Sequence, residues 1–172
     1  MLSKNTAWWL MADFAIWMAG GVSVPLYPTL AADTIRQILT HSEAKWLFVG
    51  KLDGWDGMKG GIPSGLPCIG LPLAPKNDYP QWDDIVARSQ PLPGQPLRPG
   101  DDMCTIMYTS GTTGMPKGVM HTFAAFAWSI STARPIFDLL MSVSEWSSAP
   151  VGQALTQGMS SHISQGSCRA TK

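Results

Sequence analysis

The segment Tyr108–Gly118, YTSGTTGMPKG, places three glycines and four serine or threonine hydroxyls between two apolar stretches. Asp102–Tyr108 before it has the composition of a strand, and Val119 and Met120 resume an apolar strand after it. Glycine permits backbone angles and close approaches that a Cβ would block. The pattern therefore predicts two strands joined by a tight polar loop. We call Tyr108–Gly118 the glycine–hydroxyl segment.

The side chains of this segment favour an anionic ligand. Backbone N–H groups in such a turn can converge on an anion, and Lys117 adds a compact positive charge. Hydroxyls that can donate to phosphate oxygens belong to Thr109, Ser110, Thr112 and Thr113. The Walker pattern GxxxxGK[ST] is excluded because Lys117 lies between Pro116 and Gly118. A flexible hairpin turn without a ligand is the alternative, but this density of glycine and hydroxyl groups favours a polyphosphate site.

The N-terminal run Ala7–Leu30 is nearly continuous apolar sequence. Asp13 interrupts its first half, and Gly20, Gly21 and Pro25 break a helix before it reaches the ~20 apolar residues that a membrane span needs. A buried helix of a globular domain explains the run better than a membrane segment does. Ser3 or Asn5 can cap this helix, which we expect to reach about Met18 and to be covered on most sides.

Further along, the chain alternates strand and helix. Val22–Tyr27 is a candidate strand shortened by Pro25, Asp33–His41 a helix with one apolar face, and Lys45–Val49 a short strand. Strand, helix and strand at this spacing predict a parallel βαβ unit with a right-handed crossover. The remaining expected elements are a short strand within Leu66–Leu71, a helix over Trp82–Arg88, an extended connector over Pro91–Gly100, and a helix from Phe123 to about Ala133 capped by Thr122.

Composition limits the class of protein. A chain of 172 residues fits one domain, and its 12 basic and 12 acidic residues cancel, which gives no nucleic-acid footprint. Only 14% of residues are charged while 45% are hydrophobic, so many surfaces should be buried against a further part of the chain or a partner. Cys68, Cys104 and Cys168 show no metal-ligand spacing and indicate a reduced, cytoplasmic setting.

The sequence YTSGTTGMPKGVMHT at 108–122 resembles the phosphate-loop signature of the AMP-forming acyl- and aryl-CoA synthetase family, which includes luciferases and peptide-synthetase adenylation domains. The run MADFAIWMAGGVSVPLYPTLAADTIRQILTHSEAKWLFVG at 11–50 is similar to the large N-terminal domain of that family. Within the family, AGGVSVPLYPTL followed by HSEAKWLFVG is most similar to bacterial long-chain fatty-acid CoA ligases. The resemblance covers about three-quarters of the chain, roughly residues 3–133.

The resemblance implies an α/β fold, in which the chain forms part of the N-terminal domain of adenylate-forming enzymes. It implies a carboxylic acid, here a long-chain fatty acid, that is activated with ATP and Mg²⁺ to an acyl-adenylate and then transferred to coenzyme A. The residues that it implies for the β- and γ-phosphates of ATP are Thr109, Ser110, Gly111, Thr112, Thr113, Gly114 and Lys117. The resemblance also implies that the protein is cytoplasmic. It leaves open whether the protein associates peripherally with the inner membrane, and it leaves open the oligomeric state.

This sequence also departs from the family pattern. It has no Tyr-Gly-x-Thr-Glu segment, no ribose-binding Asp, no catalytic lysine of a mobile C-terminal domain, and no first strand before Ser3. We therefore expect residues 1–133 to be a fragment of the AMP-binding domain and residues 134–172 to be a divergent, poorly ordered tail, as a frameshift or truncated gene model would produce. We expect this fragment to be inactive alone. The alternative is a non-catalytic nucleotide-binding remnant or an unstable product.

Other candidate residues carry less weight. His121 follows the glycine–hydroxyl segment, where a nucleotide contact is less expected than a strand-end histidine, and His41 and His162 have no partner at catalytic spacing in the sequence. Cys104 fits a buried small hydrophobic residue. Asp101 and Asp102 are neighbours on a strand, so their side chains should point to opposite faces rather than share a proton.

Overall fold

The computed structural model describes residues 1–91, 93–94, 97–109, 116–129 and 131. The chain divides into one unit of residues 1–126 and a second of residues 127–172, which is described only at 127–129 and 131. All named helices and strands belong to the first unit. The tail predicted over residues 134–172 lies outside the described residues, and so does most of the glycine–hydroxyl segment, Ser110–Met115.

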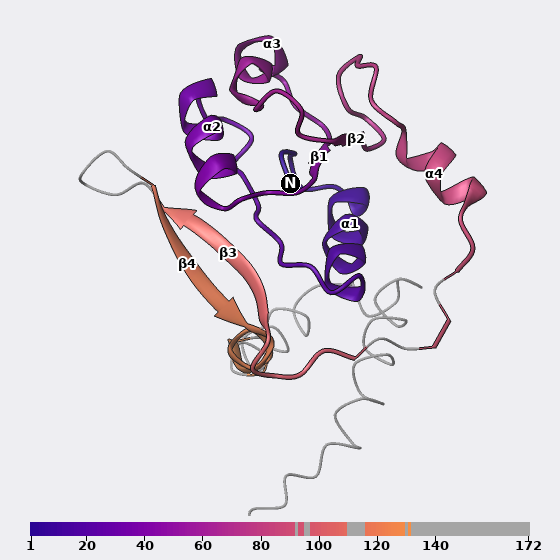
Figure 1. The fold of residues 1–172 in the computed structure, drawn as a ribbon, viewed down its shortest axis with the longest axis vertical. Coiled ribbons are helices and arrows are strands. Elements are labelled where there is room, and N and C mark those ends of the chain that lie inside the picture. The colour runs from indigo at the N-terminus through magenta and orange to yellow at the C-terminus, as the bar shows by residue number, and fades with distance from the viewer. Residues whose placement is uncertain (92, 95–96, 110–115, 130, 132–172) are drawn as a thin grey trace, which may run out of the picture. The chain divides into compact units, whose positions relative to one another are not determined.

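Short parallel pairings build the sheet layer of the first unit. Strand β1 (Leu47–Val49) pairs in parallel with β2 (Cys68–Gly70), as Figure 1 shows. Isolated parallel bridges extend this pair, because Leu2 bridges both Val49 and Leu26. Strand β3 (Met103–Thr109) joins the layer through a parallel bridge between Thr105 and Ser23. The predicted parallel α/β architecture is confirmed, and its outer strand, β4 (Lys117–Thr122), runs antiparallel to β3.

The predicted strand over Val22–Tyr27 is wrong as a regular element. This segment makes bridges only at Ser23 and Leu26. Pro25 lies between them and has no N–H to donate, so a continuous ladder cannot form there. Leu2 separates the segment from β1 and makes isolated bridges on both sides without forming a regular strand. The two arms of the predicted βαβ unit are parallel but not adjacent.

Helix α1 (Ala7–Met18) begins and ends on local signals. Its N-cap is Thr6, whose Oγ1 accepts from Trp9 N–H at 3.1 Å, rather than the predicted Ser3 or Asn5. At the other end Gly20 has a φ of 82°, and Gly21 N–H donates to Ile16 O at 2.8 Å. This is a Schellman ending, which requires the left-handed backbone that glycine adopts most readily. The predicted helix end at Gly20–Gly21 is confirmed.

The expectation that α1 is covered on most sides is wrong for the described part of the chain. Only Ala12 and Asp13 are buried in it, whereas Leu10 and Phe14 are each 49% exposed. One side packs against Met1 and Leu71 through partly buried tryptophans and Ile16. The sequence signals a helix with little polar surface, but burial also requires partner elements. The described residues supply them beside Ile16 and beside Trp17, whose ring meets those of Phe123 and Phe126 edge to face, but leave Leu10 and Phe14 half exposed.

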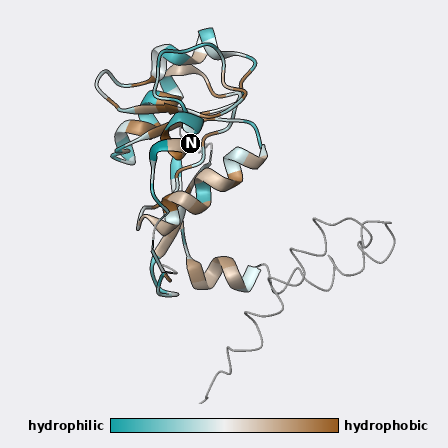
Figure 2. Cartoon of the chain, turned by 90° about the vertical axis from the view of Figure 1, so that its right-hand side faces the viewer, coloured by the Kyte–Doolittle hydropathy of each residue, from teal (hydrophilic) through white to brown (hydrophobic). Residues whose placement is uncertain are grey.

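Helix α2 (Ala32–His41) lies where the apolar periodicity predicts it. Ile35, Ile38 and Leu39 are all buried and join Leu47 and Val49 of β1 in the main core cluster. The brown, apolar ribbon of the short strands near the N-terminus marks this core in Figure 2. Burial of one helix face fixes α2, and with it the last turn that carries His41, against the sheet.

The connections between strands contain three short helices. Helix α3 (Trp55–Met58) and the 3₁₀ helix η1 (Lys59–Gly61) follow β1, and α4 (Trp82–Arg88) follows β2 with the predicted bounds. Residues 123–129 are helical, and Ala125 N–H donates to Thr122 Oγ1 at 3.2 Å, as the predicted cap requires. Within the described residues, no helix has the length and apolar character needed to cross a membrane.

Candidate phosphate-binding site

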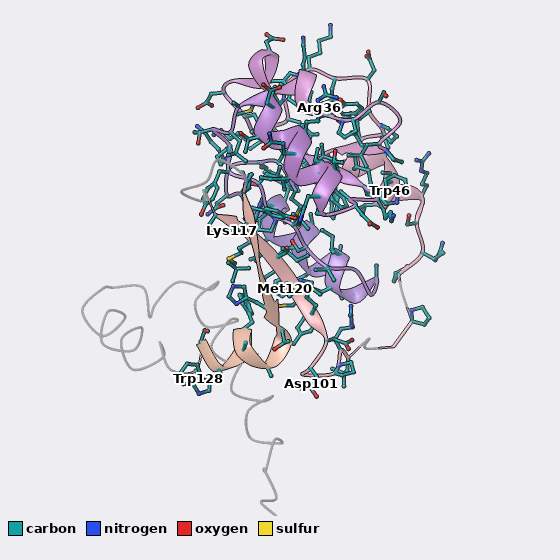
Figure 3. All side chains as sticks on the ribbon, turned by 60° about the vertical axis from the view of Figure 1, so that its left-hand side comes forward. Arg36, Trp46, Asp101, Lys117, Met120 and Trp128 are labelled. Atoms are coloured by element: carbon teal, nitrogen blue, oxygen red, sulfur yellow. The ribbon has the colours of Figure 1, made fainter. Side chains whose placement is uncertain are left out.

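The β3–β4 hairpin brings the two ends of the glycine–hydroxyl segment together. Thr109, the last residue of β3, pairs with Lys117, the first residue of β4, and Tyr108 pairs with Gly118. Strand pairing thus juxtaposes a hydroxyl and an ammonium side chain that are far apart along the loop. Figure 3 shows Lys117 at the start of β4, with Met120 further along the same strand.

Burial alternates at this end of β3. Tyr108 is only 6% exposed, while Met107 and Thr109 on either side are exposed. Side chains alternate between the two faces of a strand, so the burial of Tyr108 places the Thr109 side chain on the opposite, open face. Thr109 and Lys117 are therefore both accessible to a ligand.

Tyr108 lies between His41 of α2 and Gly118 of β4. Its hydroxyl lies 2.6 Å from His41 Nδ1, and the two rings meet edge to face with centroids 5.7 Å apart. On the β4 side, a Cβ built on Gly118 would lie 3.3 Å from Tyr108 Cζ and 2.8 Å from Ile106 Cγ2. Close approach of the strands here requires glycine, as the sequence predicts for Gly118. Burial raises the pKa of the Tyr108 phenol, which keeps it protonated at neutral pH.

The electrostatics at the hairpin end suit an anion. Lys117 is exposed, and no carboxylate among the described residues lies within ion-pair distance of it. The acidic residues nearest in sequence, Asp101 and Asp102, stand at the other end of β3, where Asp102 accepts from Arg98 Nε at 2.9 Å. An unneutralised cation beside a hydroxyl can bind a phosphate oxygen through a charge-assisted hydrogen bond.

The predicted site residues fall into two groups. The structure brings Thr109 and Lys117 together, whereas Ser110, Gly111, Thr112, Thr113 and Gly114 lie outside the described residues. Among the described residues, no group of three or more His, Cys, Asp or Glu side chains is arranged to hold a metal ion.

Two weaker candidates behave as predicted. Cys104 is fully buried, and its thiol donates to His121 O at 3.2 Å, so it packs as a small hydrophobic residue. Burial raises its pKa, which disfavours the reactive thiolate. His121 lies near the far end of β4, four residues beyond Lys117 along that strand.

Sequence reasoning missed the contact of His41. Spacing along the chain gave His41 no partner, because Tyr108 lies 67 residues away. No local signal pointed to this contact, because His41 is exposed at the last residue of α2 and only the fold brings it to the Tyr108 hydroxyl.

Comparisons with known proteins agree with this fold. A curated relative, the long-chain-fatty-acid–CoA ligase FadD15 of Mycobacterium tuberculosis, is 31% identical over 144 residues, which cover 77% of this chain and 23% of that protein. The peroxisomal long chain acyl-CoA synthetase 6 of Arabidopsis thaliana is 34% identical over 136 residues, covering 70% of this chain and 19% of its own length. The human long-chain-fatty-acid–CoA ligase ACSBG2 is 27% identical over 140 residues, which cover 74% of this chain and 21% of that protein. The chain thus spans about a fifth of the length of these relatives.

Solved structures share the fold. The amide bond synthetase McbA from Marinactinospora thermotolerans superposes with a TM-score of 0.60 at 23% identity, covering 77% of this chain and 26% of that one. The anthranilate CoA ligase AuaEII, solved with anthranoyl-AMP, gives a TM-score of 0.58 at 24% identity. The match covers 71% of this chain and 24% of that one. The family model described as AMP-binding enzyme matches residues 1–163. This chain therefore belongs to the AMP-binding enzyme family, whose members are AMP-forming acyl-CoA synthetases and related adenylate-forming enzymes.

Proposed function

We propose that this chain provides the pyrophosphate-binding part of an AMP-forming ligase that activates a carboxylic acid, a long-chain fatty acid, for transfer to coenzyme A. The observation that carries the proposal is the pairing of exposed Lys117 with exposed Thr109 at the open end of the β3–β4 hairpin. The fatty-acid class is supported by the relatives, which are long-chain acyl-CoA ligases.

The proposed roles follow from the chemistry of each side chain. Lys117 pairs with the β- and γ-phosphates of ATP, and the hydroxyl of Thr109 donates to a neighbouring phosphate oxygen. The remaining proposed contacts, from hydroxyl and backbone N–H groups between the strands, are those of Ser110, Gly111, Thr112, Thr113 and Gly114. In this proposal Mg²⁺ accompanies the phosphates of ATP, and no residue of the chain is assigned to it.

The proposed reaction has two steps. A carboxylate oxygen of the acid attacks the α-phosphorus of ATP, and the bond to the β-phosphate oxygen breaks, which gives acyl-adenylate and pyrophosphate. The sulfur of coenzyme A then attacks the acyl carbon, and AMP leaves. Negative charge accumulates on pyrophosphate during the first step, so a cation fixed beside it stabilises that transition state more than the ground state.

The chain alone is proposed to bind but not to complete this reaction. The 172 residues contain no Tyr-Gly-x-Thr-Glu segment and no counterpart of the catalytic lysine that the family resemblance implies. The second candidate function is accordingly a non-catalytic nucleotide-binding module. It needs only the Lys117–Thr109 pairing and none of the absent motifs, whereas the exposed apolar side chains of α1 and β4, including Phe14 at 49% and Met120 at 68% exposure, leave surface for a further part of a ligase to cover.

Titration of the purified chain with pyrophosphate and with Mg-ATP, followed by calorimetry, tests the binding proposal. Lys117→Met should weaken pyrophosphate binding by about tenfold to a hundredfold, as expected for one charge-assisted hydrogen bond. Lys45→Met is the matched control because Lys45 is 81% exposed and lies only 4.0 Å from Glu43 in a surface pair. Equal binding by the Lys117→Met and Lys45→Met variants would remove Lys117 from the site.

ATP–pyrophosphate exchange in the presence of long-chain fatty acids separates the two candidate functions. The proposal expects binding without appreciable exchange by the chain alone. Exchange dependent on a fatty acid would show that this chain completes adenylation without the missing segments. Binding of nucleotide with no exchange, even when the remaining part of a homologous ligase is supplied, would favour the non-catalytic module.

A further inference from the structure

A hydrogen bond joins the last turn of α2 to the end of β3. His41 Nδ1 and the Tyr108 hydroxyl are 2.6 Å apart, with the two ring planes at 89°. Either group can donate, depending on the tautomer of the imidazole. A phenol of ordinary pKa 10.0 is protonated at neutral pH, and burial raises the pKa of Tyr108 further, so its hydroxyl can donate to Nδ1 in the tautomer that leaves Nδ1 without a proton.

Both partners are tied to the main core in different ways: the Tyr108 side chain is itself a buried member of the core cluster, whereas the His41 side chain is exposed on the last turn of a core-packed helix. His41 belongs to a helix whose buried face, formed by Ile35, Ile38 and Leu39, is part of the main core. Tyr108 stands one residue before the open end of the hairpin, where Thr109 pairs with Lys117. The hydrogen bond therefore connects a helix anchored in the core to the strand end that carries the proposed phosphate ligands.

Packing on the other side of the ring adds to this restraint. Gly118 lies so close to Tyr108 that a Cβ would meet the ring at 3.3 Å. The ring is thus confined between α2 and β4, and its hydroxyl is fixed by His41. Movement of Tyr108 would shift Thr109, its neighbour in the chain, and Gly118, its partner across the hairpin.

We infer that His41 is a positioning residue for phosphate binding, which acts through Tyr108 to hold Thr109 and Lys117 in the arrangement that binds pyrophosphate. His41 itself makes no contact with phosphate in this inference. The inference rests on the proposed function and assigns a role to a residue outside the glycine–hydroxyl segment. Its physical basis is preorganisation: a hairpin end that is already ordered loses less conformational entropy when the ligand binds.

The chain offers variants that separate the hydrogen bond from packing. His41→Phe keeps an aromatic ring against Tyr108 and removes the hydrogen bond, whereas His41→Asn keeps a polar atom near the position of Nδ1 and removes the ring. Tyr108→Phe removes the hydroxyl alone. Tyr79→Phe is the control: Tyr79 is a partly buried tyrosine away from the hairpin, packed edge to face on Trp55 with ring centroids 6.4 Å apart.

Pyrophosphate affinity and thermal stability are measured for each variant, the affinity at a temperature well below every Tm. We expect His41→Phe and Tyr108→Phe each to weaken binding by about three- to tenfold, the range for one hydrogen bond. The double variant should bind no more weakly than either single variant, because both remove the same interaction. His41→Asn should restore most of the affinity, and Tyr79→Phe should leave it unchanged.

The outcomes distinguish this inference from the proposed function. Variants that melt at lower temperature but bind pyrophosphate as tightly as the unaltered chain overturn the positioning role alone, because His41 is then only structural. Additive losses in the double variant also overturn it, because His41 and Tyr108 then act separately. Failure of the unaltered chain to bind pyrophosphate overturns the proposed function and, with it, this inference.

Discussion

The ring of Tyr108 occupies the space that a side chain at Gly118 would need: a Cβ at Gly118 would lie 3.3 Å from Tyr108 Cζ. The same Cβ would lie 2.8 Å from Ile106 Cγ2, closer than real Cβ contacts come. The two strands can pair in this register only because one of the facing residues is glycine.

Gly118→Ala should therefore destabilise the protein by about 1–3 kcal/mol, the usual cost of overpacking. Denaturant unfolding measures this loss. Gly57→Ala is the control, since nothing lies within 4 Å of a Cβ at Gly57 in α3, and alanine is the better helix former. Equal stability of the Gly118→Ala variant and the unaltered chain would show that β4 moves away from Tyr108 without cost.

The N-cap of α1 gives a second prediction. Thr6 Oγ1 accepts from Trp9 N–H at 3.1 Å, and Thr6→Ala should lower the free energy of unfolding by about 1 kcal/mol. Thr6→Ser should keep most of the stability of the unaltered chain because the hydroxyl that caps the helix remains. Circular dichroism during thermal unfolding checks both variants, and equal Tm values for the alanine and serine variants would argue against the cap.

Asp13 makes stability depend on pH. Burial raises its pKa above the ordinary value of 3.8, so the folded state holds a proton that the unfolded state has lost. The free energy of unfolding should therefore fall as the pH rises from about 3.8 through the folded pKa. Asp13→Asn cannot titrate and should remove this fall.

The prediction for Asp13 is tested by measuring how the free energy of unfolding changes with pH in the unaltered chain and in the Asp13→Asn variant. Burial lowers the pKa of the Met1 amino group to about 5, which gives the opposite slope between about 5 and its ordinary value of 8.0. The Asp13 carboxylate raises the pKa of the Met1 amino group, so Asp13→Asn also changes this contribution. The two proteins are therefore compared between pH 3.8 and about 5, below the range in which the Met1 contribution changes with pH. A difference that does not change with pH would contradict the prediction.

Arg98 ties the connector before β3 to the end of α1. Its Nε donates to Asp102 at 2.9 Å, its Nη1 to Trp17 O at 3.3 Å, and its guanidinium lies 5.5 Å from the centroid of the Phe123 ring. Arg98→Lys should cost about 1–2 kcal/mol because a point charge cannot keep these contacts together. Arg88→Lys, at an exposed position in α4, is the control and should change the free energy of unfolding by no more than about 0.5 kcal/mol. Denaturant unfolding measures both variants.

The sequence predicts best those elements in which local pattern and tertiary partner agree. Helix α2 and helix α4 lie where their periodicity places them, because each has polar residues for its open side. Helix α1 shows the limit: its apolar sequence predicts a helix correctly but not which side is covered, since that depends on which elements surround it. Pro25 signals a weakened strand, and the structure reduces that strand to two bridges.

The candidate site likewise contains residues that the sequence could predict and one that it could not. Thr109 and Lys117 could be named from the sequence because their chemistry lies within one short segment. His41 could not, because its partner is 67 residues away and only the packing of α2 on the sheet brings them together. Likewise, two residues such as Met1 and Leu2 have no periodicity that would reveal a strand, yet Leu2 bridges on both sides.

The bridge between Ser23 and Thr105 has a consequence for the order of folding. Thr105 also donates through its hydroxyl to Ser23 O at 3.0 Å. Ser23 is fully buried, and the two residues are 82 positions apart in the chain. During synthesis, α1, α2 and β1 leave the ribosome well before β3, and the layer beside Ser23 stays open until β3 arrives. Slow translation between these elements should therefore prolong an intermediate with an unpaired strand edge, which associates readily with other chains.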